Sequence, residues 1–300
     1  MKALGIILLS LTTAVLLFVA WFFISLPNPH QIKECLVTEM FKVDLCEKNK
    51  NYVRIGSISK YLKDVVVISE DSSFYQHQGL DWFEIENSFK TNLKDRAFSR
   101  GGSTITQQLV KNVFLTGSKN PIRKLKEAYL AYQVEKILDK KQILEKYLNV
   151  VEFGPNIFGV SAASRHYFKK HPSELNILEA AFLAYLLPSP KKYSQVYKKG
   201  ALTSFSRRRL LDLTYKMYRY GRIQQSQYFV AREAIDQFPW QDLDPVILAA
   251  LDGAVVPESE AELPISEELV GEPIEADEEI LNQELTPEEE VELENSLLDQ

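Results

Sequence analysis

The chain has 300 residues, of which 45% are hydrophobic, and its formal net charge is −6. This length and composition give enough apolar material for one large or two modest domains with a buried core. The two cysteines form no C-x-x-C pair and the four histidines are scattered, so the sequence indicates no metal site.

The charge is divided sharply along the chain. Residues 252–300 contain 18 acidic residues and no lysine or arginine, which leaves 35 basic against 23 acidic residues, a net charge of +12, in residues 1–251. A basic body favours anionic partners such as lipid head groups or phosphates.

Residues 3–26 are predicted to be a transmembrane anchor. These 24 residues carry no charge, which is enough to cross a bilayer with some tilt. The alternative is a cleaved signal peptide, but no clear A-x-A site follows and the apolar stretch is long for that role. Lys2 and the N-terminus favour a cytoplasmic start, which places the rest of the chain outside the cytoplasm and argues against nucleic acid as a partner.

Residues 27–60 are interpreted as a connector, and residues 61–245 as a mostly helical domain. Cys35 and Cys46 lie in the connector. In an oxidising compartment they could form a small disulfide loop, and the alternative is two free thiols.

The stretch SEDSSFYQHQG, residues 69–79, brings two adjacent carboxylates, Glu70 and Asp71, up to the apolar run at residues 65–68. A buried carboxylate is costly unless it is paired, hydrogen-bonded or kept for chemistry. Solvated loops also begin with acidic residues, so this stretch alone leaves both interpretations open. His77 is interpreted as a structural hydrogen-bonding residue rather than a general base.

Residues 100–112, RGGSTITQQLVKN, predict the start of an amphipathic helix that Ser103 or Thr104 can cap. On a helical wheel, one side of this helix is apolar and the other is a polar strip. The polar strip is formed by Gln107, Gln108, Lys111 and Asn112. Free N–H groups at the helix start would suit a phosphate or a sugar. We favour ligand binding over an ordinary surface helix, because four polar-face positions without a carboxylate are unusual for a solubilising face.

Residues 121–149 predict further helix, with Pro121 in the first turn. The wheel places Glu127 among apolar residues, with Arg123 four residues earlier. The two form either a structural ion pair or a tuned catalytic group, and the residues alone favour the ion pair. Glu145 is a further acidic candidate, with an exposed helix charge as the alternative.

Residues 253–300 are interpreted as a solvated, disordered acidic tail, because a segment rich in Pro, Glu and Ser with almost no aromatic residues is typical of disorder. The alternative is a docking helix for a basic partner. Residues 286–298 suit such a helix, since a capping-box sequence is followed there by apolar residues.

In this order, the segments resemble the motifs of the peptidoglycan glycosyltransferases, a family that includes monofunctional transglycosylases and the N-terminal modules of class A penicillin-binding proteins. The resemblance extends over residues 69–217. It is carried by SEDSSFYQHQG, GGSTITQQLVKN, RKLKE (123–127) and QILEKYLN (142–149), with RRRLLDLTYKM (207–217) a looser fit to a fifth motif. Residues 151–168 resemble the monofunctional branch, and no transpeptidase motif is present.

This resemblance implies a lysozyme-like, two-lobed, mainly α-helical fold and the polymerisation of lipid II on the periplasmic side of a bacterial inner membrane. The 4-hydroxyl of the acceptor GlcNAc would attack the anomeric carbon of the lipid-linked donor chain with inversion, expelling undecaprenyl diphosphate. A divalent cation, Mg²⁺ or Mn²⁺, would assist, although the sequence contains no dedicated metal site. The acidic tail has no counterpart in this family pattern, and the resemblance therefore implies no role for it. Independently of the resemblance, we expect the tail to dock other cell-wall synthesis proteins.

The resemblance also implies a role for individual residues. Glu70 would be the general base and Glu127 a second carboxylate at the donor diphosphate. The leaving diphosphate would be stabilised by Lys111, Arg123 and Lys124. The other predicted substrate-binding residues are Asp71, Ser103, Thr104, Gln107, Gln108, Asn112 and Lys119.

Three residues depart from the family pattern. Lys119 stands where arginine is common, which keeps the charge but loses bidentate geometry. In the fifth motif, Leu213 and Thr214 replace the usual Val-Leu, so the choice between Arg208 and Arg209 as the functional arginine stays open.

Two alternative functions remain. A lytic transglycosylase or muramidase would share the fold and a catalytic glutamate, but would need neither an anchor nor cations for a diphosphate. A catalytically silent scaffold would recruit partners through the acidic tail and would need neither Glu70 nor Glu127.

Overall fold

The computed structural model of the chain describes residues 2–95, 102–118 and 120–253. The predicted acidic tail, apart from Gly253, and the predicted site residue Lys119 therefore lie outside the described residues.

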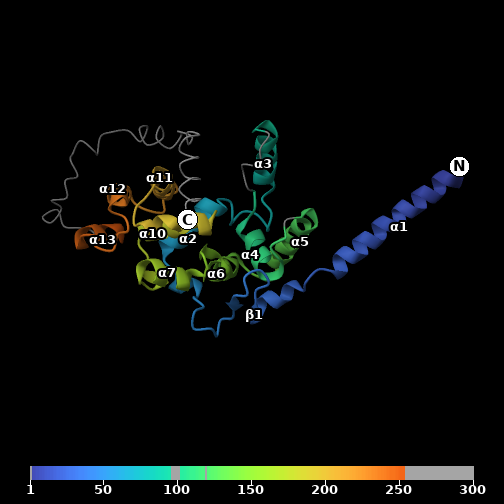
Figure 1. Ribbon diagram of the computed structural model, residues 1–300, viewed down its shortest axis with the longest axis horizontal. Coiled ribbons are helices and arrows are strands. Elements are labelled where there is room, and N and C mark those ends of the chain that lie inside the picture. Colours follow the sequence, from blue (N-terminus) through green and yellow to red (C-terminus); the bar gives the residue numbers. More distant parts are fainter. Residues whose placement is uncertain (1, 96–101, 119, 254–300) are drawn as a thin grey trace.

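The described residues are mainly α-helical, as predicted (Figure 1). The α-helices are α1 (Lys2–Ile24), α2 (Lys60–Glu70), α3 (Trp82–Asp95), α4 (Ile105–Phe114), α5 (Pro121–Ile137), α6 (Lys140–Val150), α7 (Val160–Phe168), α8 (Ile177–Leu186), α9 (Pro190–Tyr193), α10 (Gln195–Lys199), α11 (Ser204–Arg219), α12 (Gln225–Ala234) and α13 (Pro245–Leu251). The 3₁₀ turns are η1 (Pro29–Lys33), η2 (Ile55–Ser57), η3 (Pro172–Glu174) and η4 (Ile235–Gln237). Two antiparallel hairpins pair β1 (Leu36–Val37) with β2 (Asp44–Leu45) and β3 (Glu152–Gly154) with β4 (Ile157–Phe158).

The helix α1 stands apart from the body as a single rod (Figure 1). Within the described residues it is the one helix long and apolar enough to cross a membrane, and it leaves large apolar side chains exposed. Apolar surface of this extent needs lipid or a partner, so α1 is consistent with the predicted anchor. Its last turn contacts α5, where the Phe23 and Tyr129 rings meet edge to face, 5.5 Å apart.

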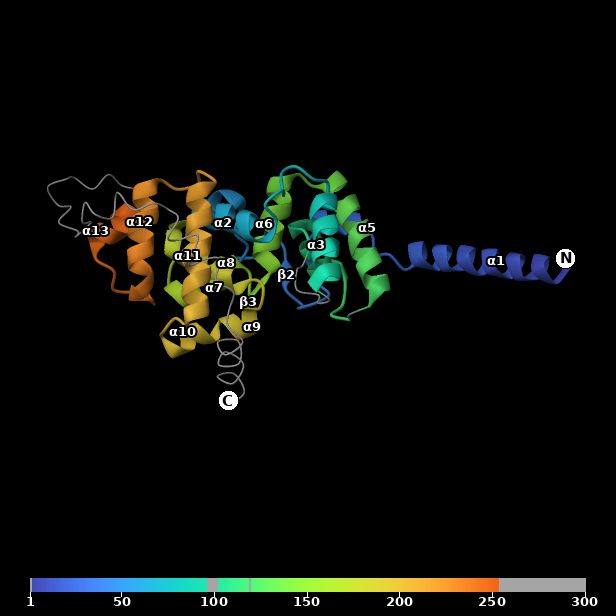
Figure 2. The ribbon, with the colours of Figure 1, turned by 90° about the horizontal axis from the view of Figure 1, so that it is seen from above.

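The helices of the body form two groups (Figure 2). On the side nearer α1, α4 packs between α5 and α6. On the far side, α8 is fully buried, with α2 and α11 packed against it. The sequence of α8, ILEAAFLAYL, is apolar almost all round, and such a helix belongs in the centre of a core.

The connector is folded onto the body rather than a loose linker. Ile32 and Leu45 are buried in the core, and a disulfide joins Cys35 to Cys46, which decides between the two predicted thiol states. Glu145 is neither exposed nor free for chemistry. Its carboxylate accepts hydrogen bonds from the Tyr52 hydroxyl at 2.5 Å and from the Ile55 N–H at 2.6 Å, and so fixes the connector to α6.

The turn between α6 and α7 gives a prediction for stability. Gly159 has a φ of +76°, and a Cβ added there would lie 2.5 Å from the Asn149 carbonyl oxygen. We expect Gly159→Ala to destabilise the fold by about 1–3 kcal/mol, because both the left-handed backbone and the contact are unfavourable. Gly56→Ala is the matched control, since a Cβ at Gly56 meets nothing within 4 Å. Thermal unfolding of the detergent-solubilised chain measures the difference, and equal melting temperatures for the two variants would contradict the prediction.

Candidate active site

The C-terminus of α2 carries Glu70 into the body. Ser59 caps the start of this helix, and Val65 and Val66 are completely buried along it. Burial of this apolar face fixes both the rotation and the depth of α2. The predicted general base, the last residue of the helix, is therefore held at a defined point between the two groups of helices.

Asp71 joins three segments at this point. Its Oδ2 accepts a hydrogen bond from the Ile105 N–H of α4 at 2.9 Å, and its carboxylate lies 2.9 and 3.0 Å from His77 Nε2. His77 Nδ1 in turn accepts from the Gly79 N–H at 3.1 Å. Both residues thus have the structural hydrogen-bonding role that the sequence indicated for His77.

The N-terminus of α4 corrects one prediction. Thr104 caps the helix, and a capping box pairs it with Gln107 at 3.1 and 3.2 Å. The Ile105 N–H is occupied by Asp71. Two of the N–H groups expected to form a phosphate cradle, those of Ile105 and Gln107, are therefore already engaged within the protein. Thr104 and Gln107, both predicted as substrate-binding residues, are buried and form this cap, and Thr104 also lines the cavity beside Glu70 that is described below.

Gln108 connects α4 to the predicted base. Its Nε2 donates to Glu70 Oε2 at 2.9 Å, while its Oε1 accepts from the buried Tyr147 hydroxyl at 3.1 Å. The pKa of Glu70 is raised by burial, and Asp71 adds to the rise. The hydrogen bond from Gln108 and the positive charges of Arg209 and Lys111 oppose it. A raised pKa makes the Glu70 carboxylate a stronger proton acceptor, which suits a general base that must take a proton from a hydroxyl group.

The second carboxylate lies in a cluster of cations. Glu127 is buried and accepts from Arg123 Nη1 at 3.2 Å and from Lys124, which also donates to Ser103 Oγ at 2.8 Å. The helical-wheel prediction of an ion pair between Arg123 and Glu127 is confirmed.

The charges of both carboxylates, Glu70 and Glu127, act on Lys111. Burial and the neighbouring Arg123 and Lys124 lower its pKa, whereas Glu127 and Glu70 raise it. Among the described residues no carboxylate comes within 4.0 Å of its ammonium group. Lys111 thus has no ion-pair partner among the described residues, which leaves its charge available to an anion that enters the site.

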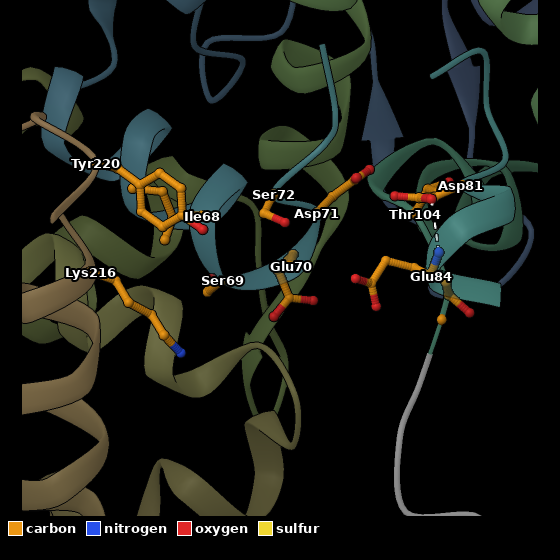
Figure 3. Close-up of a pocket in the computed structure, with 12 residues that line it drawn as sticks. Ile68, Ser69, Glu70, Asp71, Ser72, Asp81, Glu84, Thr104, Lys216 and Tyr220 are labelled. Carbon is orange, nitrogen blue, oxygen red and sulfur yellow. Dashed lines mark hydrogen bonds between the residues drawn. The ribbon is translucent and has the colours of Figure 1, made fainter. Parts of the chain in front are cut away.

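A cavity of about 320 Å³ opens beside Glu70, and α11 forms one of its walls (Figure 3). Lys216 and Tyr220 line that side, whereas Asp81, Glu84 and Thr104 lie across the cavity from them. Ser103 lines the cavity as well.

Lys216 and Tyr220 were not among the predicted site residues. They come from a segment far along the chain, and the loose fit to the fifth motif, which ends at Met217, was the one available signal for them.

The structure also separates the fifth-motif arginines. Arg207 forms a two-point ion pair with Asp236, at 2.6 and 2.8 Å, away from the site. Arg209 pairs with Asp212 at 3.1 Å and acts on the charge of Glu70. Arg209 therefore acts on the site, whereas Arg207 is engaged with Asp236. The choice between Arg208 and Arg209 as the functional arginine stays a prediction.

One predicted strip residue is buried rather than solvent-facing. Asn112 is 3% exposed, and its side-chain oxygen has no hydrogen-bond partner in the part of the chain that the structure describes. The predicted strip on α4 is thus partly core, and Gln108 and Lys111 are its members directed to the two carboxylates.

Comparison with known proteins gives a consistent result. Residues 37–215 match a family model described as transglycosylase. A protein of Chromobacterium violaceum named biosynthetic peptidoglycan transglycosylase is 46% identical over 149 residues, which are 50% of this chain and 65% of that protein. Proteins of the same name from Bordetella pertussis and Nitrosomonas eutropha are 43% and 39% identical, over 53% and 62% of this chain and 67% and 80% of their own lengths. This chain therefore spans slightly less than two thirds of the Chromobacterium relative.

The raised pKa of Glu70 predicts a stability cost. A carboxyl whose pKa is higher in the folded than in the unfolded state binds protons more strongly when folded, so stability is lost as the pH rises through the folded value, about 1.4 kcal/mol for each unit of difference. Glu70→Gln should therefore raise the melting temperature at pH 8 and lose this gain near pH 4. Melting curves of the solubilised chain at both pH values test this, and a lower melting temperature for the variant at pH 8 would contradict it.

Proposed function

Because the chain belongs to the transglycosylase family, with the family's helical, lysozyme-like domain, we propose that it polymerises lipid II into peptidoglycan glycan strands without a transpeptidase step. The observation that carries the proposal is the position of Lys111. Its ammonium has no carboxylate within 4.0 Å among the described residues, and it lies under the influence of both Glu70 and Glu127.

In the proposed reaction Glu70 removes the proton from the 4-hydroxyl of the acceptor GlcNAc. The new bond forms between that oxygen and the anomeric carbon of the donor chain while the bond from this carbon to the phosphate oxygen breaks, which inverts the configuration. The proton passes from Glu70 to solvent, and undecaprenyl diphosphate leaves. Gln108 holds the Glu70 carboxylate at 2.9 Å, so the base is oriented before the acceptor arrives.

The leaving diphosphate would be received by Lys111, Arg123 and Lys124. Buried Glu127 holds the last two in place. Arg123 has a further donor, Nε, that is buried and without a partner among the described residues, and this donor suits a phosphate oxygen. Three cations against one carboxylate leave the cluster positive, which stabilises the charge that develops on the leaving group.

The membrane is the proposed source of the substrate. Trp82 and Phe83 are each 71% exposed on α3, and a second cavity of about 620 Å³ lies between Trp82, Tyr129 and Tyr132. Tyr129 also contacts Phe23 of α1. This apolar surface therefore continues from the anchor and suits a polyprenyl chain, with the domain on the periplasmic side.

A divalent cation is proposed as a companion of the substrate rather than of the protein. The described residues include no group of three His, Cys, Asp or Glu side chains placed to hold a metal. The cations around Glu127 would also repel one. The residues of this site therefore do not fit a resident metal, and the cation would enter bound to the diphosphate.

A lipid II polymerisation assay with the detergent-solubilised chain and a divalent cation tests the function. Glu70→Gln should lower the rate by about 10²–10⁴-fold, the usual loss when a general base is removed. Lys111→Ala should weaken lipid II binding as well as turnover. Glu233→Gln, which changes an exposed glutamate of α12, is the matched control and should retain the rate. Cleavage of finished glycan without polymerisation would instead identify a lytic enzyme, and lipid II binding without either reaction a scaffold.

The pH dependence tests the electrostatic role of Arg209. Its positive charge lowers the pKa of Glu70. Because Glu70 acts unprotonated, Arg209→Gln should shift the acidic limb of the kcat/KM profile to higher pH. Arg207→Gln makes the same change of charge at the Asp236 pair and should leave the limb where it is. Equal limbs in the two variants would show that Arg209 does not act on the base.

A further inference from the structure

A basic cavity lies on the body between the connector and α7–η3. Its volume is about 600 Å³, and it is separate from the cavity beside Glu70. Five cations and one carboxylate line it: Lys50, Arg54, Arg165, Lys169, Lys170 and Glu47. This concentration of positive charge needs an explanation, because the cavity contains none of the residues assigned to the proposed reaction.

Most of these cations are not neutralised. Lys170 pairs with Glu179 at 2.8 Å, and Arg54 lies 3.9 Å from Glu47. Lys50, Arg165 and Lys169 have no carboxylate within 4.0 Å in the described ranges. Like charges that are gathered around a hollow repel one another, so the cavity is suited to an acidic occupant.

The chain leaves the described body close to this cavity. Asp252 follows α13. Burial raises the pKa of its carboxyl, and the positive charges of Lys170 and Lys60 oppose that rise. The next residue, Gly253, lies at the start of α2, where an added Cβ would be 3.7 Å from the Tyr61 hydroxyl oxygen. Lys170 thus belongs to the wall of the cavity and to the surroundings of the exit point.

We propose that the acidic segment 254–300 of this chain docks in the basic cavity. The segment contains 17 acidic residues and no lysine or arginine. Its first acidic residues, Glu258, Glu260 and Glu262, come within nine residues of Gly253, and an extended chain of nine residues reaches about 30 Å. The tether also gives the segment an effective concentration on the order of millimolar, so weak individual contacts are sufficient.

The catalytic cations are the competing location, and the structure disfavours them. The exit point is at the Lys60 end of α2, whereas Glu70 is at the other end, about 15 Å further along at the rise of an α-helix, so the basic cavity is the nearer of two locations that the tether can reach. Arg123 and Lys124 are also already paired with Glu127. The proposed docking is independent of the enzymatic activity and can be tested without a substrate.

The experiment uses the full chain in detergent at low ionic strength. Carbodiimide treatment joins carboxylates to nearby amines without a spacer, and mass spectrometry then identifies the linked residues. We expect carboxylates of residues 254–300 to be linked to Lys50, Lys169 and Lys170, with links several-fold fewer at 0.5 M salt because exposed charges are screened there. Links mainly to Lys111 or Lys124, or no links from the segment, would overturn the proposal.

A second measurement uses charge reversal. In Lys50→Glu/Lys169→Glu, a glutamate-specific protease should cleave residues 254–300 several-fold faster than in the unmodified chain, because the released segment is more accessible. Lys198→Glu/Lys199→Glu makes the same change of charge at exposed positions of α10 outside the cavity and should leave the rate unchanged. Melting temperatures verify that both variants are folded, and equal cleavage rates in folded variants would contradict the docking.

Discussion

The buried carboxylate of Asp71 is the constraint on which the site depends. It accepts hydrogen bonds from the start of α4 and from His77, and so joins the end of α2 to both segments. Glu70 precedes it on α2, and Gln108 lies one turn along α4 from Ile105. A bond between Asp71 and Ile105 therefore fixes the distance between the base and the amide that holds it. Loss of this single acceptor would free the two helices to move apart.

The electrostatics of the site follow from that geometry. Burial disfavours the charged form of Glu70 and also that of Lys111. Without the other, each group would be shifted towards its neutral form. Because the two lie within each other's field, each partly restores the charge of the other. Glu127 also favours the charged form of Lys111. The cleft thus maintains a base and a cation together, which an acid–base step with an anionic leaving group requires.

Local sequence patterns were sufficient for the features that depend on helical spacing. The pair Arg123–Glu127 and the cap at Thr104 were predicted because both partners lie within one turn of each other. The occupied Ile105 N–H could not be predicted in this way, since its acceptor Asp71 is 34 positions earlier in the chain. Lys216 and Tyr220 were missed because the packing of α11 against α2 and α8, not a local pattern, brings them to the cavity.

Because the chain has a basic body and an acidic segment, the acidic segment can compete with an anionic substrate for the same cations. The cations proposed to receive a diphosphate must be accessible before the substrate arrives, and 17 carboxylates on the same chain would compete for them. A basic cavity at the exit point offers the acidic segment a nearer partner. The length of α2 then keeps the two sets of cations apart, because Lys60 and Glu70 stand at its opposite ends. If both proposals hold, α2 has two functions: its buried face positions the proposed base Glu70, and its length separates the cations proposed for the substrate from those proposed for the acidic segment.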